Sequence, residues 1–575
     1  MNMRKSFIRL HLPALLLALT IGAATAVPQL SNIRAMGDAF AGVYPINNDD
    51  ELYYMTRARD ALDGHVFLTN PYLFEHKDGS PMQFWLPDYL EAHATLWFFS
   101  DHARGYQFFD FLFPAILALL TYGIAYKLTN STSLALLTAL VLHLGIFFED
   151  FNRAPSPQFT FLFFLLFWYA VVSYLKSPRR YFLAIAALAL GAQFNFYPYH
   201  WTYTLVALGI FLVAAKFVYR SFALKPYAYM LAGGGILGIP YFFSLVRSMQ
   251  NPFYKESLMR LGLIHTHTPS GMVIVAAATG TLILWGILFS AKMFQRDILN
   301  IFAASIAAAG IIAVNQHVLT GKNLEFSSHY LMAALFGAVL LAAYLAGIVY
   351  RSLAAQKKFW GTFFLIAAGT VGIPFSLWRV PQVVAKQSVP TPTEWYVQTY
   401  APLFHWLQTH TPKESVVYAD QQLSRYIPAY THNNVFYTRE ANLFFLSDSE
   451  VKERFVISTF FQKSFNREFV LANERALWGV HYIDERGHER QVQKIKTLLH
   501  RSTALPPATP PESEITDVVR LRALVEQEGF LAAAERYRLE YIVWDRNREP
   551  TWHLDGESYL TPVADIGSFT VYTFK

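Results

Sequence analysis

About eleven stretches of this chain are apolar over roughly 20 residues each, the length that an α-helix needs to cross a bilayer. They are 8–29, 107–127, 132–149, 159–175, 180–197, 200–219, 228–248, 271–291, 298–316, 328–350 and 359–378. Charged residues make up 15% of the chain, whereas soluble domains carry about a quarter. The sequence therefore predicts a polytopic α-helical membrane protein with about 11 transmembrane helices.

Lysine and arginine in the short loops predict the orientation. With a cytoplasmic N-terminus, the inner segments carry about 15 of these residues and the short outer loops about five, as the positive-inside rule requires. The protein is thus expected in a plasma membrane of bacterial or archaeal type, and its net charge of +6 needs no nucleic acid to explain it. A cleavage-like triplet, Ala24-Thr25-Ala26, follows the first apolar run, but the length of that run favours a retained anchor over a signal peptide. In either case loop 30–106 and the segment after about residue 380 are predicted to lie outside.

The chain changes character after residue 379. Charged residues become frequent, and the short alternating runs SVVYA (415–419), YIVW (541–544) and FTVYTF (569–574) predict strands. Helical patterns lie between them, at 448–462, 489–500 and 516–538. We therefore predict a transmembrane domain over 1–379, which includes the outer loop 30–106, and an extracytoplasmic soluble α/β domain over 380–575.

Three consecutive acidic residues, Asp49, Asp50 and Glu51, begin an amphipathic helix that is predicted within the outer loop. In one interpretation Asn48 or Asp49 caps this helix, and the helix dipole favours the remaining carboxylates. Capping needs only one side chain, however, so a second interpretation is a general base or metal ligand held at the boundary between water and lipid. The residues themselves leave both interpretations open.

The outer loop continues with an ordered series of motifs. Asp50 is followed by the pair Tyr53-Tyr54, by an Arg-containing helix that ends near Gly64, and by DGSPMQFWLPDYLEA (78–92). This order resembles the first outer loop of the GT-C superfamily of glycosyltransferases, and in particular the catalytic subunit of oligosaccharyltransferases. The resemblance implies a multi-span enzyme that takes a sugar from a polyprenyl-phosphate or polyprenyl-diphosphate carrier and passes it to an acceptor on the outer face. It also implies that Asp50 is the essential acidic residue, with Asp49 as the neighbouring candidate.

Two departures separate the chain from the oligosaccharyltransferases. In the loop FEDFNRAPSPQF (148–159), where those enzymes carry a second acidic motif, Glu149 and Asp150 come early and PSPQ occupies the later acidic position. The Trp-Trp-Asp-Tyr-Gly motif that reads their peptide acceptor is absent. These departures favour a relative that transfers a single sugar. They leave a divalent cation, Mg²⁺ or Mn²⁺, open as a cofactor, with Glu51, Glu149 and Asp150 as supporting acidic residues.

Transfer from a lipid phosphate also requires positive charge or hydrogen-bond donors for the departing phosphate. The predicted donor-phosphate ligands on the outer face are Arg153, Lys255, Arg260, Lys322 and His329, with Gln316 as a neutral donor. A pair with Glu149 or Asp150 explains Arg153 equally well, and ordinary interfacial placement explains the polar residues of 314–330.

Taken with the resemblance, these features predict a GT-C membrane glycosyltransferase, and an inverting one, because a single carboxylate suffices for one displacement. Its expected partners are a polyprenyl-phosphate-linked sugar, an extracytoplasmic glycan, lipid or protein acceptor, and the lipid bilayer. The alternatives are an oligosaccharyltransferase that moves a preassembled glycan, and a transporter or flippase for a lipid-linked saccharide. The transporter is disfavoured because the spans carry almost no charge away from their ends and show no matching halves.

Overall fold

The computed structural model describes residues 2–46, 48, 50–82, 84–99, 101–151, 153–264, 267–292, 297–323, 327–499 and 509–575. The chain divides into two compact units. Unit 1 comprises Met1–Ala35, Ala103–Phe242 and Pro269–Pro390, and unit 2 comprises Met36–His102, Phe243–Thr268 and Thr391–Lys575. The outer loop therefore groups with the C-terminal segment, which differs from a division of the chain after residue 379.

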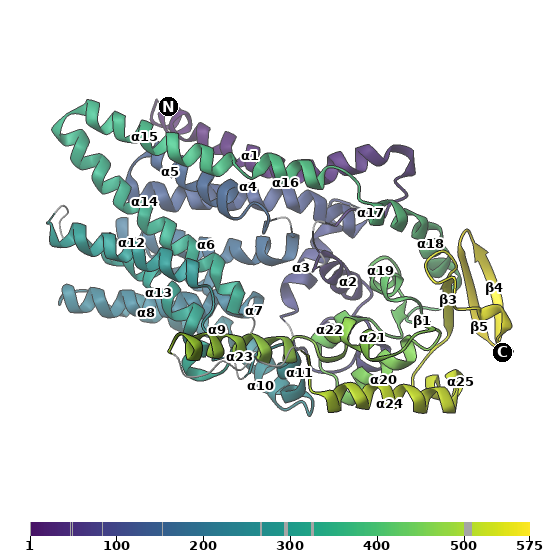
Figure 1. Ribbon diagram of the computed structural model, residues 1–575. Helices are drawn as coiled ribbons and strands as arrows, with labels where there is room; N and C mark the ends of the chain where they lie inside the picture. Colours follow the sequence, from purple (N-terminus) through teal and green to yellow (C-terminus); the bar gives the residue numbers. More distant parts are fainter. Residues whose placement is uncertain are drawn as a thin grey trace. The chain divides into compact units, whose positions relative to one another are not determined.

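Within the described ranges, unit 1 is built of helices (Figure 1). They are α1 (Asn2–Met36), α4 (His102–Thr129), α5 (Thr132–Leu140), η3 (Val141–Ile146), η4 (Ala154–Phe159), α6 (Thr160–Lys176), α7 (Arg180–Phe196), α8 (Pro198–Val218), α9 (Lys225–Leu237), α12 (Met272–Ser290), α13 (Ile298–Thr320), η5 (Ser327–His329), α14 (Tyr330–Gln356), α15 (Lys358–Leu377) and α16 (Val380–Gln387). Helix α10 (Ile239–Met249) runs from unit 1 into unit 2.

Every predicted apolar stretch coincides with a helix, but among the described residues eight helices are long and apolar enough to cross a membrane. The stretch 132–149 forms a shorter apolar helix, Thr132–Ile146, and the stretch 180–197 forms the 17-residue α7. The stretch 228–248 divides into α9 and α10, which bend by 51° and make a ninth span only if they are taken together. The structure thus confirms a polytopic α-helical membrane protein. The number of membrane-spanning helices among the described residues is lower than the predicted eleven. Hydropathy reports how apolar a stretch is, but not where its backbone bends or stops.

Three long helices of unit 1 carry the predicted polar segments at one end. Helices α13 and α14 pack against each other, and α8 packs against both. Tyr197 and Tyr199 at the start of α8 lie against His329 at the start of α14. At a rise of about 1.5 Å per residue these helices are roughly 30–40 Å long, so their other ends lie a membrane thickness away.

The three helices approach one another closely where glycine replaces a side chain. A Cβ at Gly337 on α14 would lie 2.8 Å from the Tyr203 hydroxyl, and a Cβ at Gly310 on α13 would lie 2.9 Å from the Ala334 Cβ. The Tyr203 hydroxyl donates a hydrogen bond to the Ile306 carbonyl at 2.7 Å. Small residues at such crossings let helices in lipid gain van der Waals contact, which is the main attraction between them there.

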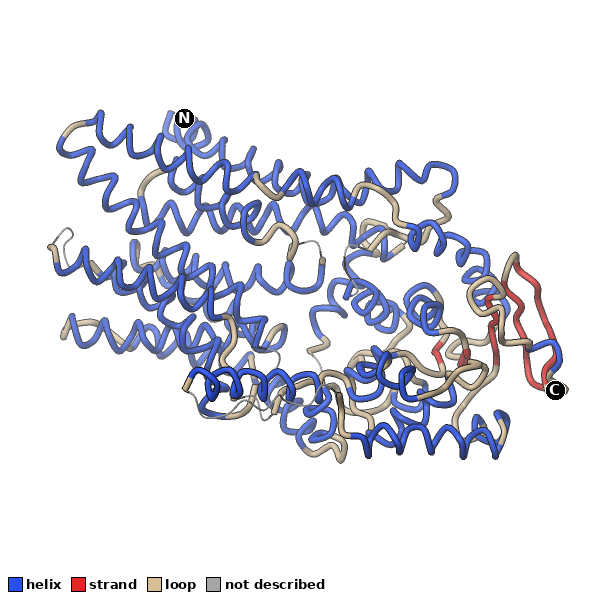
Figure 2. The backbone as a smooth tube through the Cα atoms, viewed as in Figure 1, coloured by secondary structure: helices blue, strands red, loops and turns tan. Residues whose placement is uncertain are grey.

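Unit 2 combines many short helices with one small sheet, whose strands are the red segments of Figure 2. Its helices are η1 (Gly37–Ala39), α2 (Asp50–Leu62), η2 (Phe74–His76), α3 (Leu86–Thr95), α11 (Tyr254–Arg260), α17 (Pro392–Val397), η6 (Gln398–Tyr400), α18 (Ala401–His410), α19 (Gln421–Tyr430), η7 (Arg439–Leu443), α20 (Asp448–Ser458), α21 (Arg467–Ala472), α22 (Glu474–Trp478), α23 (His481–Leu498), α24 (Glu512–Glu528), α25 (Phe530–Ala534) and η8 (Leu554–Gly556). Its strands are β1 (Val416–Tyr418), β2 (Asn434–Val435), β3 (Tyr541–Asp545), β4 (Leu560–Ile566) and β5 (Phe569–Phe574).

The sheet is mixed, in the order β2-β1-β3-β5-β4. Strand β1 pairs in parallel with β2 and β3, and β5 pairs antiparallel with β3 and β4. At one edge, the backbone N–H of Val435 in β2 donates to the carbonyl of Tyr72 in the outer loop at 3.0 Å. At the other edge, β4 carries Pro562 and a register shift between Pro562 and Ala564. The three strand predictions correspond to β1, β3 and β5.

The outer loop is held to the C-terminal part of unit 2 by a buried arginine. The Arg454 guanidinium on α20 pairs with Glu450 at 2.8 Å and with Glu75 of the outer loop at 2.8 Å, and it donates to the Phe436 carbonyl at 3.1 Å. His76, next to Glu75, lies 2.9 Å from the same Glu450 carboxylate. Because Arg454 is almost completely buried, these contacts fix the loop firmly in unit 2.

Candidate functional site

Helix α2 begins at Asp50, the residue on which the predicted chemistry depends. The Asn48 side-chain oxygen accepts the backbone N–H of Asp50 at 3.0 Å, so Asn48 satisfies the start of the helix. The Asp50 side chain is exposed and Glu51 is half-buried. Asp49, the neighbouring candidate, lies outside the described residues. Since Asn48 serves the helix start, the Asp50 carboxylate is not required for that contact.

A buried ion pair joins helix α2 to helix α3. Arg57, two turns after Asp50, pairs with Asp88 on α3 at 2.9 Å, and both side chains are fully buried. The guanidinium also donates to the Tyr53 hydroxyl at 3.0 Å and to the Phe84 carbonyl. Truncating one partner of such a pair leaves an uncompensated buried charge, so this arrangement holds α2 in one position. No sequence pattern predicts this pairing, because Arg57 and Asp88 are 31 positions apart.

The two predicted cations on α11 have different environments. Arg260 is buried, pairs with Asp448, and donates to the carbonyl of Leu446 at 2.7 Å and to the Ser257 hydroxyl at 3.0 Å. Its donors are used to join α11 to the segment before α20. Lys255 is exposed on the same helix. Of the two, Lys255 has the accessibility that a phosphate ligand needs.

A second group of predicted residues lies together in unit 1. The hydroxyl of Tyr197 and Nδ1 of His329 share a hydrogen bond of 2.5 Å, and their rings are stacked with centroids 5.8 Å apart. Burial, together with the smaller effect of the nearby positive charge of Arg153, lowers the pKa of His329 to about 3. His329 is therefore neutral at physiological pH, and Arg153 is the cation of this group.

Of the two acidic residues considered as partners of Arg153, Glu149 pairs elsewhere and Asp150 interacts with the charge of Arg153. The Glu149 carboxylate pairs with Arg379 at 2.7 Å, and both side chains are exposed. Asp150 lies in the turn after Phe147 and experiences the charge of Arg153. Glu149 is thus paired with Arg379, while the charge of Arg153 acts on both Asp150 and His329.

Gln316 and Lys322 lie where α13 ends. Gln316 Nε2 donates to the Lys322 carbonyl at 3.1 Å and to the Asn323 side chain at 3.0 Å, and its oxygen accepts from Thr320 at 3.0 Å. These hydrogen bonds stabilise the turn after α13, so in this structure the Gln316 side chain has a structural role. The Lys322 side chain is exposed.

The structure therefore collects the predicted residues into two groups, one in each unit. Unit 2 contains Asp50, Glu51, Lys255 and Arg260, and unit 1 contains Glu149, Asp150, Arg153, Gln316, Lys322 and His329. In the part of the chain that the structure describes, no three His, Cys, Asp or Glu side chains come together in a metal-binding arrangement. The described residues thus assign no ligand set to the open cofactor, Mg²⁺ or Mn²⁺, and we derive no step through it.

One buried acidic group lies inside a membrane helix of unit 1. Asp110 on α4 is 4% exposed, and its carboxylate accepts a hydrogen bond from Gln158 at 2.6 Å. Gln158 also donates to the Phe151 carbonyl at 2.7 Å. An acidic side chain inside a span is costly in lipid unless it is bonded in this way, and here it ties α4 to the start of the α6 span.

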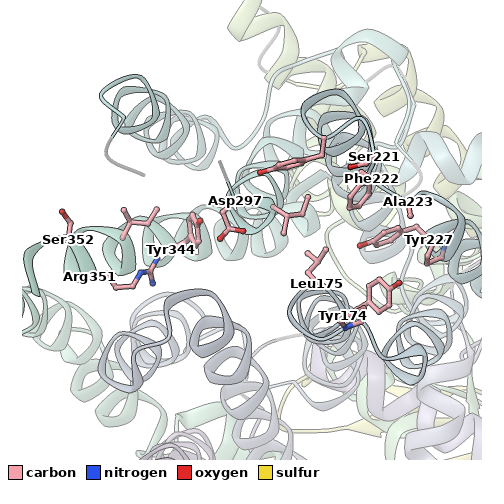
Figure 3. Close-up of a pocket in the computed structure, with 15 residues that line it drawn as sticks. Tyr174, Leu175, Ser221, Phe222, Ala223, Tyr227, Asp297, Tyr344, Arg351 and Ser352 are labelled. Carbon is pink, nitrogen blue, oxygen red and sulfur yellow. The ribbon is translucent and has the colours of Figure 1, made fainter. Parts of the chain in front are cut away.

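A cavity of about 1090 Å³ lies in unit 1, at the ends of α8, α13 and α14 remote from His329 (Figure 3). It is lined by tyrosines together with Asp297 and Arg351. None of the predicted site residues lines it.

The fold is that of a polytopic membrane protein, and unit 2 carries an exposed acidic helix start at Asp50. No protein-family model matches the chain. An uncharacterized protein of Aquifex aeolicus (strain VF5) is 30% identical over 147 residues, which is 25% of this chain and 28% of that protein. The match thus spans little more than a quarter of that relative.

Among solved structures, the chain is similar to ArnT from Cupriavidus metallidurans bound to undecaprenyl phosphate. The TM-score is 0.44 at 12% identity, over 96% of each chain. The apo structure of the same protein gives 0.43 at 13% identity, over 95% of each chain. Because both TM-scores lie below 0.5, we build the functional proposal on the residues of this chain.

Proposed function

We propose that this protein is a membrane glycosyltransferase that moves a sugar from a polyprenyl-phosphate carrier to an extracytoplasmic acceptor. The Asp50 carboxylate takes the proton of an acceptor hydroxyl while that oxygen attacks the anomeric carbon of the sugar. The bond between the anomeric carbon and the phosphate oxygen breaks, and its electron pair leaves with the phosphate. One displacement of this kind inverts the anomeric configuration.

The observation that supports this role is the division between Asn48 and Asp50. The Asn48 side chain accepts the first backbone N–H of α2, and the Asp50 side chain is exposed at the end of a helix that a buried ion pair holds in place. A general base needs this combination of access and fixed position. The resemblance of the surrounding loop to the GT-C superfamily adds the reaction class.

The developing charge on the phosphate requires a cation, for which Lys255 is our candidate in unit 2 and Arg153 is our candidate in unit 1. Arg153 is the positively charged member of its group, since His329 is kept neutral. Guanidinium binds phosphate through two parallel hydrogen bonds, which a lysine cannot match. Lys322, exposed like Lys255, is a further candidate, whereas the donors of Arg260 are used within unit 2.

The test is mass spectrometry of the lipids that copurify with the protein in mild detergent, combined with a transfer assay. A polyprenyl phosphate that carries one sugar, together with turnover of that lipid, is the expected result. A polyprenyl diphosphate that carries several sugars would replace the proposal by an oligosaccharyltransferase or a flippase, and these two differ in whether the glycan is transferred. Ordinary phospholipids alone, with polyprenyl-phosphate sugars added in excess, would overturn the proposal.

A further inference from the structure

The cavity of unit 1 lies at the end of the helices that the distribution of Lys and Arg predicts to be cytoplasmic. Asp297 precedes α13, Tyr219 follows α8, and Arg351 lies in the last two turns of α14. The Arg153–His329 group lies at the opposite ends of these helices, about 30 Å away along α8. The cavity is therefore a separate feature that the proposed glycosyl transfer does not use.

The polar lining of the cavity contains one charge of each sign and several hydroxyl groups. Figure 3 shows Asp297, Tyr344 and Arg351 along one side, with Tyr174 and Tyr227 on the other. Asp297 accepts the backbone N–H of Leu299 at 3.2 Å, and Arg351 donates to the Thr129 carbonyl at 2.7 Å.

No ion pair joins Asp297 to Arg351 among the described residues, and Lys176 at the end of α6 is a further positive charge near Asp297. The hydrogen bonds of Asp297 and Arg351 are to backbone groups, and both residues are exposed. An acid and a base that line one cavity without pairing with each other are complementary to a ligand that carries both signs. A zwitterionic head group has this property, since its ammonium and phosphate are separated by a short linker.

An apolar groove of about 520 Å³ adjoins this polar cavity and shares Tyr219 and Asp297 with it. Side chains of α8, α12 and α13 line the groove, among them Phe217, Trp285 and Phe289. Together, the cavity provides a polar site at the end of the membrane helices, and the groove provides an apolar site along them. This is the outline of an amphiphile with one head group and an acyl chain.

We infer that the cavity binds a bilayer phospholipid with a phosphoethanolamine head group. The Arg351 guanidinium meets the phosphate, the Asp297 carboxylate meets the ammonium, and the tyrosine hydroxyls complete the hydrogen bonds. The acyl chain occupies the groove beside Trp285 and Phe289. An anionic phosphoglycerol lipid of the same chain length gains the contact with Arg351 and loses the contact with Asp297.

The test is native mass spectrometry of the full-length protein after incubation with palmitoyl-oleoyl phosphoethanolamine or phosphoglycerol lipid. We expect the phosphoethanolamine lipid to be retained about tenfold more, the preference that one charge-assisted contact supplies. Asp297→Asn is the decisive variant, because asparagine caps a helix as well as aspartate and only the charge is lost. It should abolish the preference and leave binding of the phosphoglycerol lipid unchanged.

Two further variants separate the head group from the chain. Arg351→Gln should weaken retention of both lipids, whereas Lys358→Gln, an exposed charge at the same end of the helices and outside the cavity lining, should change neither. Ala308→Trp, which fills the groove, should also weaken retention of both. Equal retention of the two lipids by the unmodified protein, or an undiminished preference in Asp297→Asn, would overturn the inference.

Discussion

The side chain of Asn48 accepts the backbone N–H of Asp50 at 3.0 Å, while the Asp50 carboxylate itself is exposed. Two residues at the start of this helix thus differ: the Asn48 side chain accepts a backbone N–H of α2, and the Asp50 side chain lies at the surface, where an acceptor hydroxyl can reach it.

Asp50→Asn should lower the rate of sugar transfer by about 100- to 10,000-fold, the range that general base catalysis contributes. The fold should be kept, since the Asn48 side chain still accepts the first backbone N–H of α2 and the substituted side chain is exposed. Turnover of a polyprenyl-phosphate sugar in detergent gives the rate, and a melting curve gives the stability. Glu51→Gln, one position further along the helix, is the matched control and should retain most activity. Equal rates in Asp50→Asn and the unmodified enzyme would remove the base from the mechanism.

Arg153→Gln should raise the KM for the lipid-linked donor and also lower kcat, because a phosphate contact strengthens as the leaving group gains charge. We expect a loss in kcat/KM of about 100-fold. Arg379→Gln is the control, since it removes an exposed arginine whose partner is Glu149. A similar small effect of both substitutions on steady-state kinetics would show that the charge acts only on the surface potential.

Arg260→Gln should destabilise unit 2 instead of weakening donor binding. Its loss leaves the carbonyl of Leu446 and the Ser257 hydroxyl without a buried donor, at a cost of about 3 kcal/mol. Thermal unfolding followed by tryptophan fluorescence measures this change. Lys255→Gln, on the same helix but exposed, should leave the melting temperature within one or two degrees or so of the original. Normal stability combined with a raised KM in Arg260→Gln would contradict this assignment.

The stability of unit 2 should depend on pH through Asp60 and His65. Burial alone would raise the pKa of Asp60, but the Lys77 ammonium and the His65 ring outweigh it and hold that pKa below its usual value. The hydrogen bond to Asp60, at 2.9 Å, raises the pKa of His65. Protonated His65 therefore stabilises the folded unit fully below its ordinary pKa of 6.5. This stabilisation is lost as the pH rises through the raised pKa of the folded state.

The Asp60 carboxylate has the opposite pH dependence. It stabilises the folded unit above its ordinary pKa of 3.8, and this stabilisation is lost as the pH falls through the lowered pKa of the folded state. The cluster should thus contribute most between these two values. Melting temperatures of the unmodified protein and of His65→Gln should differ most near pH 6 and converge at alkaline pH. A difference that is constant from pH 6 to alkaline pH would show that the ring acts through packing alone.

The sequence was sufficient for the features that depend on local pattern. The membrane helices follow from apolar length, and the cap of α20 by Ser447, which accepts the Glu450 N–H at 3.1 Å, follows from its motif. Strands β1, β3 and β5 follow from alternation, whereas the two-residue β2 is too short to leave a pattern. The predicted helix over 516–538 is divided at Gly529, whose φ of +89° ends α24 before α25 begins.

Contacts between distant positions were beyond prediction from one sequence. Tyr197 is not among the predicted site residues, but its hydroxyl meets His329, 132 positions further on. Arg260 is a phosphate candidate in the sequence because it is a cation on the predicted outer face, but in the structure it is buried and bonded to Asp448 and to the Leu446 carbonyl, which are nearly 190 positions away. Hydropathy can place such residues near a membrane face, but it does not identify the residues with which they form hydrogen bonds or ion pairs.

The two edges of the sheet in unit 2 have a consequence for the protein in its native surroundings. A membrane confines its proteins to a plane, where domains of neighbouring copies collide far more often than in free solution. An open strand edge would then act as a template for end-to-end growth. Here the outer loop covers β2 at Tyr72, and β4 offers a proline and an irregular register in place of a regular row of donors. The domain can therefore be crowded on a membrane surface without its sheets joining into ribbons.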